Sequence, residues 1–311
     1  MVRKQVKALT VLYLVPCQHF GVYFAPYQIL LVMGAVFVLL AIPFFILAGN
    51  IMDVSGISVR LINFFNSLVG HTKHGTAMVC VIVACFFAAI SGSGPATVAA
   101  LGGILIPAMS KSGYEKDTSA ALMSTAGAIG IVIPPSITFV VYGSVTGTSV
   151  GDLFMAGIIP GILIGVAIYF TMVISSRGCN LVRQPKASGK ERWKAFGDAV
   201  WGILMPVIIL GGIYGGIFTP TEAAAVSAIY GLIVGVFIYK TLRFKEIVVI
   251  LRQSVSQTAV VMLIIGCAAV FGKVLTFTGL ASDASQSLIS IAHGNKSVSY
   301  THLRAHETRH D

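Results

Sequence analysis

The sequence predicts an all-α polytopic membrane protein, on the basis of its composition, its long uncharged runs and two interrupted apolar segments. Of the 311 residues, 56% are hydrophobic and only 10% are charged, and the mean hydropathy is +0.89. Soluble domains carry about 25% charged residues. The composition is therefore that of a chain that crosses a bilayer several times.

Several uncharged apolar runs are mostly long enough to cross a membrane, because a span needs about 20 apolar residues. They cover residues 8–52, 153–176, 199–221, 223–239 and 253–272. The formal charge of +10 could suggest a nucleic-acid partner, but its Lys and Arg residues cluster beside spans, at 177–194 and 240–252. Such clusters follow the positive-inside rule. We therefore place both basic loops in the cytoplasm and expect no nucleic-acid partner.

The two basic loops fix an expected topology for the rest of the chain. They bracket two spans, so the turn at residues 219–222 is expected on the periplasmic side. Working backwards along the chain, Asp152 lies outside and the loop 111–117 lies in the cytoplasm.

Two apolar segments are interrupted where a membrane helix would ordinarily continue. The first interruption, SGSGP at residues 91–95, separates the runs 76–90 and 96–109, and the second, Pro134-Pro135, lies inside the run 118–151. Proline removes a backbone donor and glycine weakens a helix, so both sites should leave backbone groups unpaired. Hydrocarbon does not tolerate such groups unless protein, water or an ion satisfies them. Because secondary transporters bind ions and substrates at such breaks, a transporter is the first hypothesis.

The first interruption predicts a re-entrant hairpin over residues 76–109. Each arm has about 15 residues, which is short for a span, and both flanks are expected in the cytoplasm. Ahead of it, residues 57–69 place apolar side chains at helical spacing with polar residues between them. This pattern predicts an amphipathic helix at the interface. It could brace a mobile domain as an arm, and plain interfacial anchoring is equally consistent.

Both ends of the chain differ from its centre. Residues 298–308 resemble the translation of a transposase sequencing adapter. We therefore expect 297–311 to be a non-native tail and the natural sequence to continue beyond about residue 296. Residues 1–32 could be a genuine first span, a misread frame or a misplaced start, and we assign them no function.

Five short strings occur in a characteristic order over roughly 240 residues. They are LAIPFFILAGN at 40–50, ISGS at 90–93 leading to ILIPAM at 104–109, IPPS at 133–136 with YG at 142–143, GDLF at 151–154 with AGIIPG at 156–161, and GGIFTPTEAAA at 215–225. In these strings the chain resembles the large membrane (permease) subunit of tripartite ATP-independent periplasmic (TRAP) transporters of the C4-dicarboxylate type. The resemblance covers about Leu39 to Leu280.

The resemblance implies an elevator-type carrier in a bacterial inner membrane. It couples sodium entry to the uptake of organic acids such as C4-dicarboxylates, with a small membrane subunit and a periplasmic substrate-binding protein as partners. Sodium is the coupling ion, and no other cofactor is implied. The family has a second repeat with its own hairpin and Pro-Pro break, which we do not find after Gly279. The chain as written is therefore expected to be incomplete and inactive alone.

This comparison gives an expected division of the chain. Residues 33–176 would form the first inverted repeat, with an arm helix at 57–69, the hairpin at 76–109 and a broken span at 118–147. A cytoplasmic basic linker at 177–198 and the start of the second repeat at 199–296 would follow.

The candidate sodium and substrate site combines the residues of both breaks. Serine and threonine hydroxyls and freed carbonyls are hard oxygen donors suited to sodium, and the start of a half-helix offers N–H groups to a carboxylate. The candidate residues are Ser91, Gly92, Ser93, Gly94, Thr97, Gly127, Gly130, Pro134, Pro135, Ser136 and Thr138. The alternatives are a small-residue packing turn at the first break and a simple proline kink at the second. Some family members carry an aspartate soon after the Ser-Gly-Ser string, where this chain has Ala96-Thr97-Val98 and therefore no carboxylate.

Three other interpretations remain beside this one. Glu222 could act as a proton-relay acid, but Thr219, Pro220 and Glu222 better fit a helix capping box. A membrane-embedded enzyme would need ionisable residues converging within the spans, whereas the aspartates lie at span edges, so we predict no enzymatic activity. A carrier of the same superfamily that needs no binding protein is the nearer rival.

Overall fold

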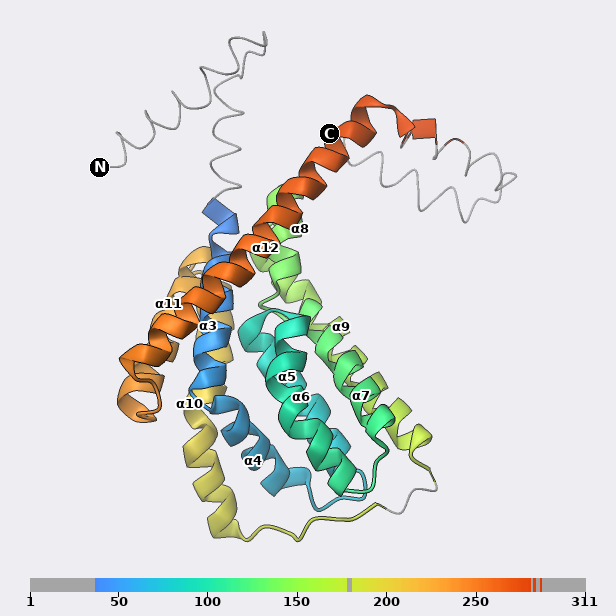
Figure 1. Cartoon of the computed structure of the whole chain (residues 1–311), viewed down its shortest axis with the longest axis vertical. Helices are drawn as coiled ribbons and strands as arrows, with labels where there is room; N and C mark the ends of the chain where they lie inside the picture. Colours follow the sequence, from blue (N-terminus) through green and yellow to red (C-terminus); the bar gives the residue numbers. More distant parts are fainter. Residues whose placement is uncertain (1–36, 178–180, 281, 284–285, 287–311) are drawn as a thin grey trace. The chain divides into compact units, whose positions relative to one another are not determined.

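The computed structural model describes residues 37–177, 181–280, 282–283 and 286, and within these ranges it contains helices and no strand (Figure 1). The helices before the second break are α3 (Ala41–Val54), α4 (Ile57–Val69), α5 (Gly75–Ser91), α6 (Gly94–Lys111) and α7 (Lys116–Ala128), with the 3₁₀ turn η1 (Ile129–Ile131). After it come α8 (Ile137–Thr146), α9 (Val150–Ser175), α10 (Gly189–Tyr214), α11 (Pro220–Ile233), the π-helical η2 (Val234–Ile238) and α12 (Phe244–Phe277).

Five of the described helices are long and apolar enough to cross a membrane. They cover Phe37–Val54, Val150–Ser175, Gly189–Tyr214, Pro220–Ile238 and Phe244–Phe277. The predicted all-α polytopic fold class is confirmed. The expected N-terminal segment 1–32 and the tail 297–311 lie outside the described residues.

Helix α10 begins at Gly189, before the predicted start of its apolar run at residue 199. The cause is a capping box, in which the Ser188 hydroxyl accepts from the Glu191 N–H and the Glu191 carboxylate accepts from the Ser188 N–H at 2.7 Å. This box satisfies N–H groups that the first turn of a helix leaves unpaired. The second half of the predicted basic linker is therefore helical.

Helices α5 and α6 run side by side and form a hairpin whose tip is the first break (Figure 1). At its open end, the hydroxyls of Thr76 and Ser112 lie 2.9 Å apart. Helix α5 is the centre of this part of the molecule, since it packs against α6, α7, α9 and η1. Its Phe87 and Ile90 are almost fully buried.

A second group of contacts joins helices that are distant in the sequence, with α3 against α11 and α4 against α10. Small residues allow the close approach. A methyl group on Gly231 of α11 would lie 3.1 Å from the Ile51 side chain, and one on Gly202 of α10 would lie 2.6 Å from the Ile57 side chain. Glycine commonly permits such close packing between membrane helices.

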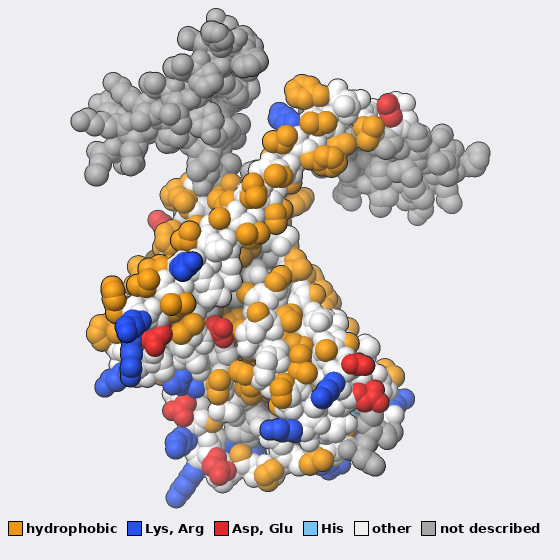
Figure 2. Space-filling view, in the orientation of Figure 1, with side chains coloured by type: hydrophobic (Ala, Val, Ile, Leu, Met, Phe, Trp, Pro, Cys, Tyr) orange, Lys and Arg blue, Asp and Glu red, His pale blue; other side chains and the backbone are white. Residues whose placement is uncertain are grey.

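The segments predicted to be cytoplasmic meet at one end of the unit formed by Met1–Ser256. His74 Nδ1 lies 3.1 Å from the Ser176 hydroxyl and 3.4 Å from the Tyr114 hydroxyl, and Val182 N–H donates to the Ser112 carbonyl. On the face that Figure 2 shows, charged side chains of this unit gather toward the same end.

The segments predicted to lie outside each contact the end of another helix. The Thr221 hydroxyl donates to the Phe37 carbonyl, and a methyl group on Gly151 would lie 3.7 Å from Ile213. From Gln257, in the second unit, α12 continues as an apolar helix to Phe277. Its Leu263 and Phe271 are exposed.

Candidate ion and substrate site at the helix breaks

The first break is a tight turn between two helix ends. Helix α5 ends at Ser91, and Gly92 follows in the left-handed conformation with φ of 62°. The next residue, Ser93, is the N-cap of α6, and its hydroxyl accepts from the Ala96 N–H at 3.5 Å. Glycine supplies the positive φ without a Cβ penalty, and serine supplies the cap. The turn therefore follows from the local sequence Ser-Gly-Ser-Gly-Pro.

The hydroxyls at this turn form one buried group. The Thr97 hydroxyl donates to the Ser93 carbonyl at 2.9 Å, and the Ser91 and Thr97 hydroxyl oxygens lie 3.3 Å apart. Ser91 is 2% exposed and Thr97 is fully buried. A hydroxyl oxygen keeps acceptor capacity after donating its hydrogen. These oxygens can therefore still coordinate a cation.

The second break follows η1 and ends where α8 begins. Pro134 and Pro135, which are joined by a cis peptide bond, and Ser136 are all buried. The Ser136 hydroxyl donates to the Ile131 carbonyl at 2.6 Å. A proline frees a carbonyl about one turn upstream, and here the serine hydroxyl satisfies it within the chain. Ser136 thus orders the break and keeps lone pairs on its oxygen.

The two breaks are in direct backbone contact. Ile137 N–H, in the first turn of α8, donates to the Gly92 carbonyl at 3.1 Å. A methyl group on Gly92 would lie 2.7 Å from the Pro135 carbonyl oxygen, and one on Gly94 would lie 3.0 Å from the Gly127 carbonyl oxygen. The hairpin tip and the broken span can approach this closely only because glycine occupies these positions.

Gly127 and Gly130 form the other side of this contact. A methyl group on Gly130 would lie 3.2 Å from the Gly94 nitrogen, and one on Gly127 would lie 2.2 Å from the Val98 side chain. Both glycines are buried. Of the predicted site residues, Thr138 differs from the rest because it is exposed on the first turn of α8.

Helix ends of both polarities converge on the contact. The carboxyl end of α5 lies beside the amino ends of α6 and α8, and η1 ends the α7 segment nearby. Carboxyl ends carry partial negative charge that attracts cations, and amino ends carry partial positive charge that attracts anions. The arrangement can therefore hold a cation and a carboxylate close together without a charged side chain.

Sequence reasoning missed one residue of this region. A methyl group on Gly49 of α3 would lie 3.0 Å from the Ser91 Cβ, so α3 touches the hairpin at the break. Gly49 belongs to the string LAIPFFILAGN at 40–50, which carried the family resemblance but was not connected with the hairpin break. Within the described part of the chain, no three His, Cys, Asp or Glu side chains could hold a metal ion together. A cation at the breaks would therefore be bound by hydroxyl and carbonyl oxygens.

Helices that break within an apolar bundle and meet at their broken ends are typical of secondary transporters. Comparison with known protein families identifies the family. Residues 8–301 match the family described as the DctM component of the tripartite ATP-independent periplasmic transporter. The chain belongs to this family. The match begins at residue 8, inside the segment to which the sequence assigned no function.

Named relatives support the same assignment. The chain is 40% identical over 268 residues to the C4-dicarboxylate TRAP transporter large permease protein DctM of Rhodobacter capsulatus, covering 82% of this chain and 61% of the relative. It is 47% identical over 240 residues to the protein of the same name in Pseudomonas aeruginosa, covering 77% and 56%. It is 39% identical over 274 residues to the sialic acid TRAP transporter large permease protein SiaM of Vibrio cholerae, covering 88% and 64%. The chain thus spans about three-fifths of the length of these relatives.

Proposed function

We propose that this chain is part of the large membrane subunit of a sodium-coupled importer of organic acids such as C4-dicarboxylates. The proposal includes a location in a bacterial inner membrane, a small membrane subunit and a periplasmic substrate-binding protein as partners. Large permease proteins named for C4-dicarboxylates, at 40% and 47% identity, support this substrate class.

The observation that carries the proposal is the meeting of the two breaks through Gly92 and Ile137. It brings buried hydroxyls of Ser91, Thr97 and Ser136 to a place where helix ends of opposite polarity converge. Sodium takes hard oxygen ligands, and a dicarboxylate takes N–H groups at helix amino ends. The same contact between hairpin and broken span would let them move together as one body in an elevator cycle.

Transport in proteoliposomes tests the proposal. A version extended to the length of its relatives would be reconstituted with the small subunit and a binding protein loaded with a C4-dicarboxylate. We expect accumulation driven by an inward sodium gradient and little accumulation with potassium in its place. Equal uptake in both salts would contradict sodium coupling. Equal uptake without the binding protein would instead favour the binding-protein-independent carrier.

A further inference from the structure

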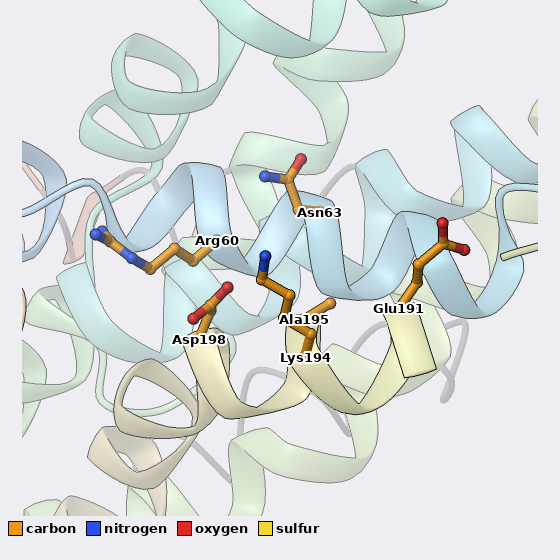
Figure 3. Close-up of a pocket in the computed structure, with 6 residues that line it drawn as sticks. All are labelled: Arg60, Asn63, Glu191, Lys194, Ala195 and Asp198. Carbon is orange, nitrogen blue, oxygen red and sulfur yellow. The ribbon is translucent and has the colours of Figure 1, made fainter. Parts of the chain in front are cut away.

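A cavity of about 170 Å³ lies between α4 and the first turns of α10, away from the helix breaks. Figure 3 shows side chains of both charge signs around it, some from each helix. The lining residues are Arg60, Asn63, Glu191, Lys194, Ala195 and Asp198. Two of them are cations and two are carboxylates, so the cavity suits a small ligand that carries both charges.

The length of α10 places this cavity at the level of lipid headgroups. The helix has 26 residues, which corresponds to about 39 Å. The hydrocarbon core of a bilayer is about 30 Å thick. Because the charged turns come first in α10, they extend beyond the core on the side of the basic loops.

The position of Tyr239, which follows a different helix, also places the cavity at the level of the lipid headgroups. It directly follows the candidate span Pro220–Ile238, and its hydroxyl donates to the Asp198 carbonyl at 2.7 Å. Burial raises the pKa of Tyr239 to about 12, so the hydroxyl keeps its hydrogen at neutral pH. The guanidinium carbon of Arg60 lies 3.8 Å from the centre of the Tyr239 ring. Tyrosine is enriched at the membrane–water interface.

Aromatic side chains next to the cavity agree with this depth. Trp193 is 75% exposed and meets Phe196 edge-on with ring centres 5.9 Å apart. Phe196 in turn packs against Phe64 of α4 at 5.6 Å. An exposed tryptophan beside charged turns is typical of the interfacial belt.

In the described part of the chain, the charged side chains that line the cavity do not form ion pairs with one another. Arg60 donates to the carbonyls of Ser55 and Gly56 at 2.9 and 3.0 Å, which fixes its guanidinium beside the Tyr239 ring. Among the residues that the structure describes, no ion pair joins Arg60 or Lys194 to Glu191 or Asp198. The Glu191 carboxylate is held by the Ser188 N–H in the capping box. A ligand with a phosphate and an ammonium group would complement the two cations and the Asp198 carboxylate.

We propose that this cavity binds the headgroup of a phospholipid that carries a phosphate and a primary ammonium group, as phosphatidylethanolamine does. Arg60 and Lys194 contact the phosphate, and Asp198 accepts a hydrogen bond from the ammonium. A choline headgroup has no N–H to donate, and a purely anionic headgroup would offer no hydrogen bond to the Asp198 carboxylate. The bound lipid joins the interfacial helix α4 to the membrane-spanning helix α10.

Lipid retention measured by native mass spectrometry tests this proposal on the chain itself. The protein would be purified in detergent with equal amounts of phosphatidylethanolamine, phosphatidylcholine and phosphatidylglycerol. We expect phosphatidylethanolamine to be retained in preference to the other two. Asp198→Asn and Lys194→Gln should each reduce this retention roughly tenfold, the effect of losing one charge-assisted hydrogen bond.

Lys190→Gln is the matched control, because Lys190 is an exposed lysine of the same helix outside the cavity. It should leave retention unchanged. Equal retention of ethanolamine and choline lipids, a preference for phosphatidylglycerol, or no effect of both cavity variants would overturn the proposal. Soluble phosphoethanolamine should compete only weakly, and competition as strong as that of the lipid would also overturn it.

Discussion

At the residue scale, the site depends on positions that have no side chain. Gly92 has a φ of 62°, and a methyl group there would lie 2.7 Å from the Pro135 carbonyl oxygen. Gly94, Gly127 and Gly130 line the same contact. Their role is to let two backbones meet, so that serine and threonine hydroxyls on either side reach one place.

Alanine substitutions of Gly92 and Gly147 distinguish two effects on stability, backbone strain and the loss of close approach. Gly147 has a similar φ of 72° but open space around it. Gly92→Ala and Gly147→Ala should each lower the free energy of unfolding by about 1–2 kcal/mol, because alanine is strained in the left-handed conformation. In detergent, Gly92→Ala should lower the free energy of unfolding clearly more than Gly147→Ala does, because its methyl group also pushes the Pro135 carbonyl away. Equal losses in the two variants would contradict the close contact.

His74 gives the molecule a predicted pH dependence at the end that we predict to be cytoplasmic. Burial, and secondly the charge of Lys73, lower the pKa of His74 below its usual value. The folded state therefore disfavours the protonated ring, while the unfolded chain takes up a proton near pH 6.5. The stabilisation from neutral His74 is present above about pH 6.5 and is lost as the pH falls toward the folded-state pKa.

The melting temperature between about pH 7.5 and pH 5.5 measures this effect. The wild-type chain should lose more stability over this interval than His74→Asn, which cannot titrate. The same loss in both proteins would show that His74 does not cause the pH dependence.

At the element scale, capping decides where several helices begin. The Glu222 carboxylate accepts from the Thr219 N–H at 2.9 Å, and the Thr219 hydroxyl accepts from the Glu222 N–H at 3.3 Å. The predicted capping box is confirmed. Glu222 is thus accounted for by its local helix.

This assignment predicts different results for the two members of the box. Thr219→Ala should cost about 1 kcal/mol of stability. Glu222→Gln should be nearly neutral for stability and transport, because glutamine also completes a capping box. Loss of transport in Glu222→Gln with unchanged stability would instead support the proton-relay interpretation.

The positions of most elements could be predicted from the sequence, because apolar runs and Gly/Pro interruptions are local signals. The start of α10 could not, since its charged first turns resemble a loop even though Ser188 and Glu191 carry the capping pattern. The contact of Gly92 with Pro135 and Ile137 depends on how distant segments pack, which no local pattern encodes. Gly49 was missed for the same reason.

At the scale of the whole molecule, the topology stays a prediction, and contacts within Met1–Ser256 group some of its segments. His74, Tyr114 and Ser176 meet at one end, and Thr221 meets Phe37 in another group. Which end faces the cytoplasm rests on the positive-inside rule.

Labelling of single cysteines in a background without the native cysteines tests the sidedness. Cysteines at Lys186 and Lys240 should react only from the cytoplasm, and those at Asp152 and Thr219 only from outside. Asp152, Lys186 and Thr219 are exposed, so a lack of access cannot come from burial there. The opposite pattern would reverse the orientation and place the hairpin mouth on the wrong face.

The central claim is that hydroxyls at the meeting point of the two breaks bind the coupling sodium ion. The most direct measurement is the sodium dependence of uptake in proteoliposomes for Ser91→Ala/Ser93→Ala, in a version extended to the length of the relatives. Ser144→Ala is the control, because Ser144 is a partly buried serine of α8 whose hydroxyl donates to the Val141 carbonyl of its own helix. We predict that the double variant is produced normally and needs roughly tenfold more sodium for half-maximal uptake, equivalent to about 1.4 kcal/mol. Sodium activation identical to that of the wild type and of Ser144→Ala would contradict the claim.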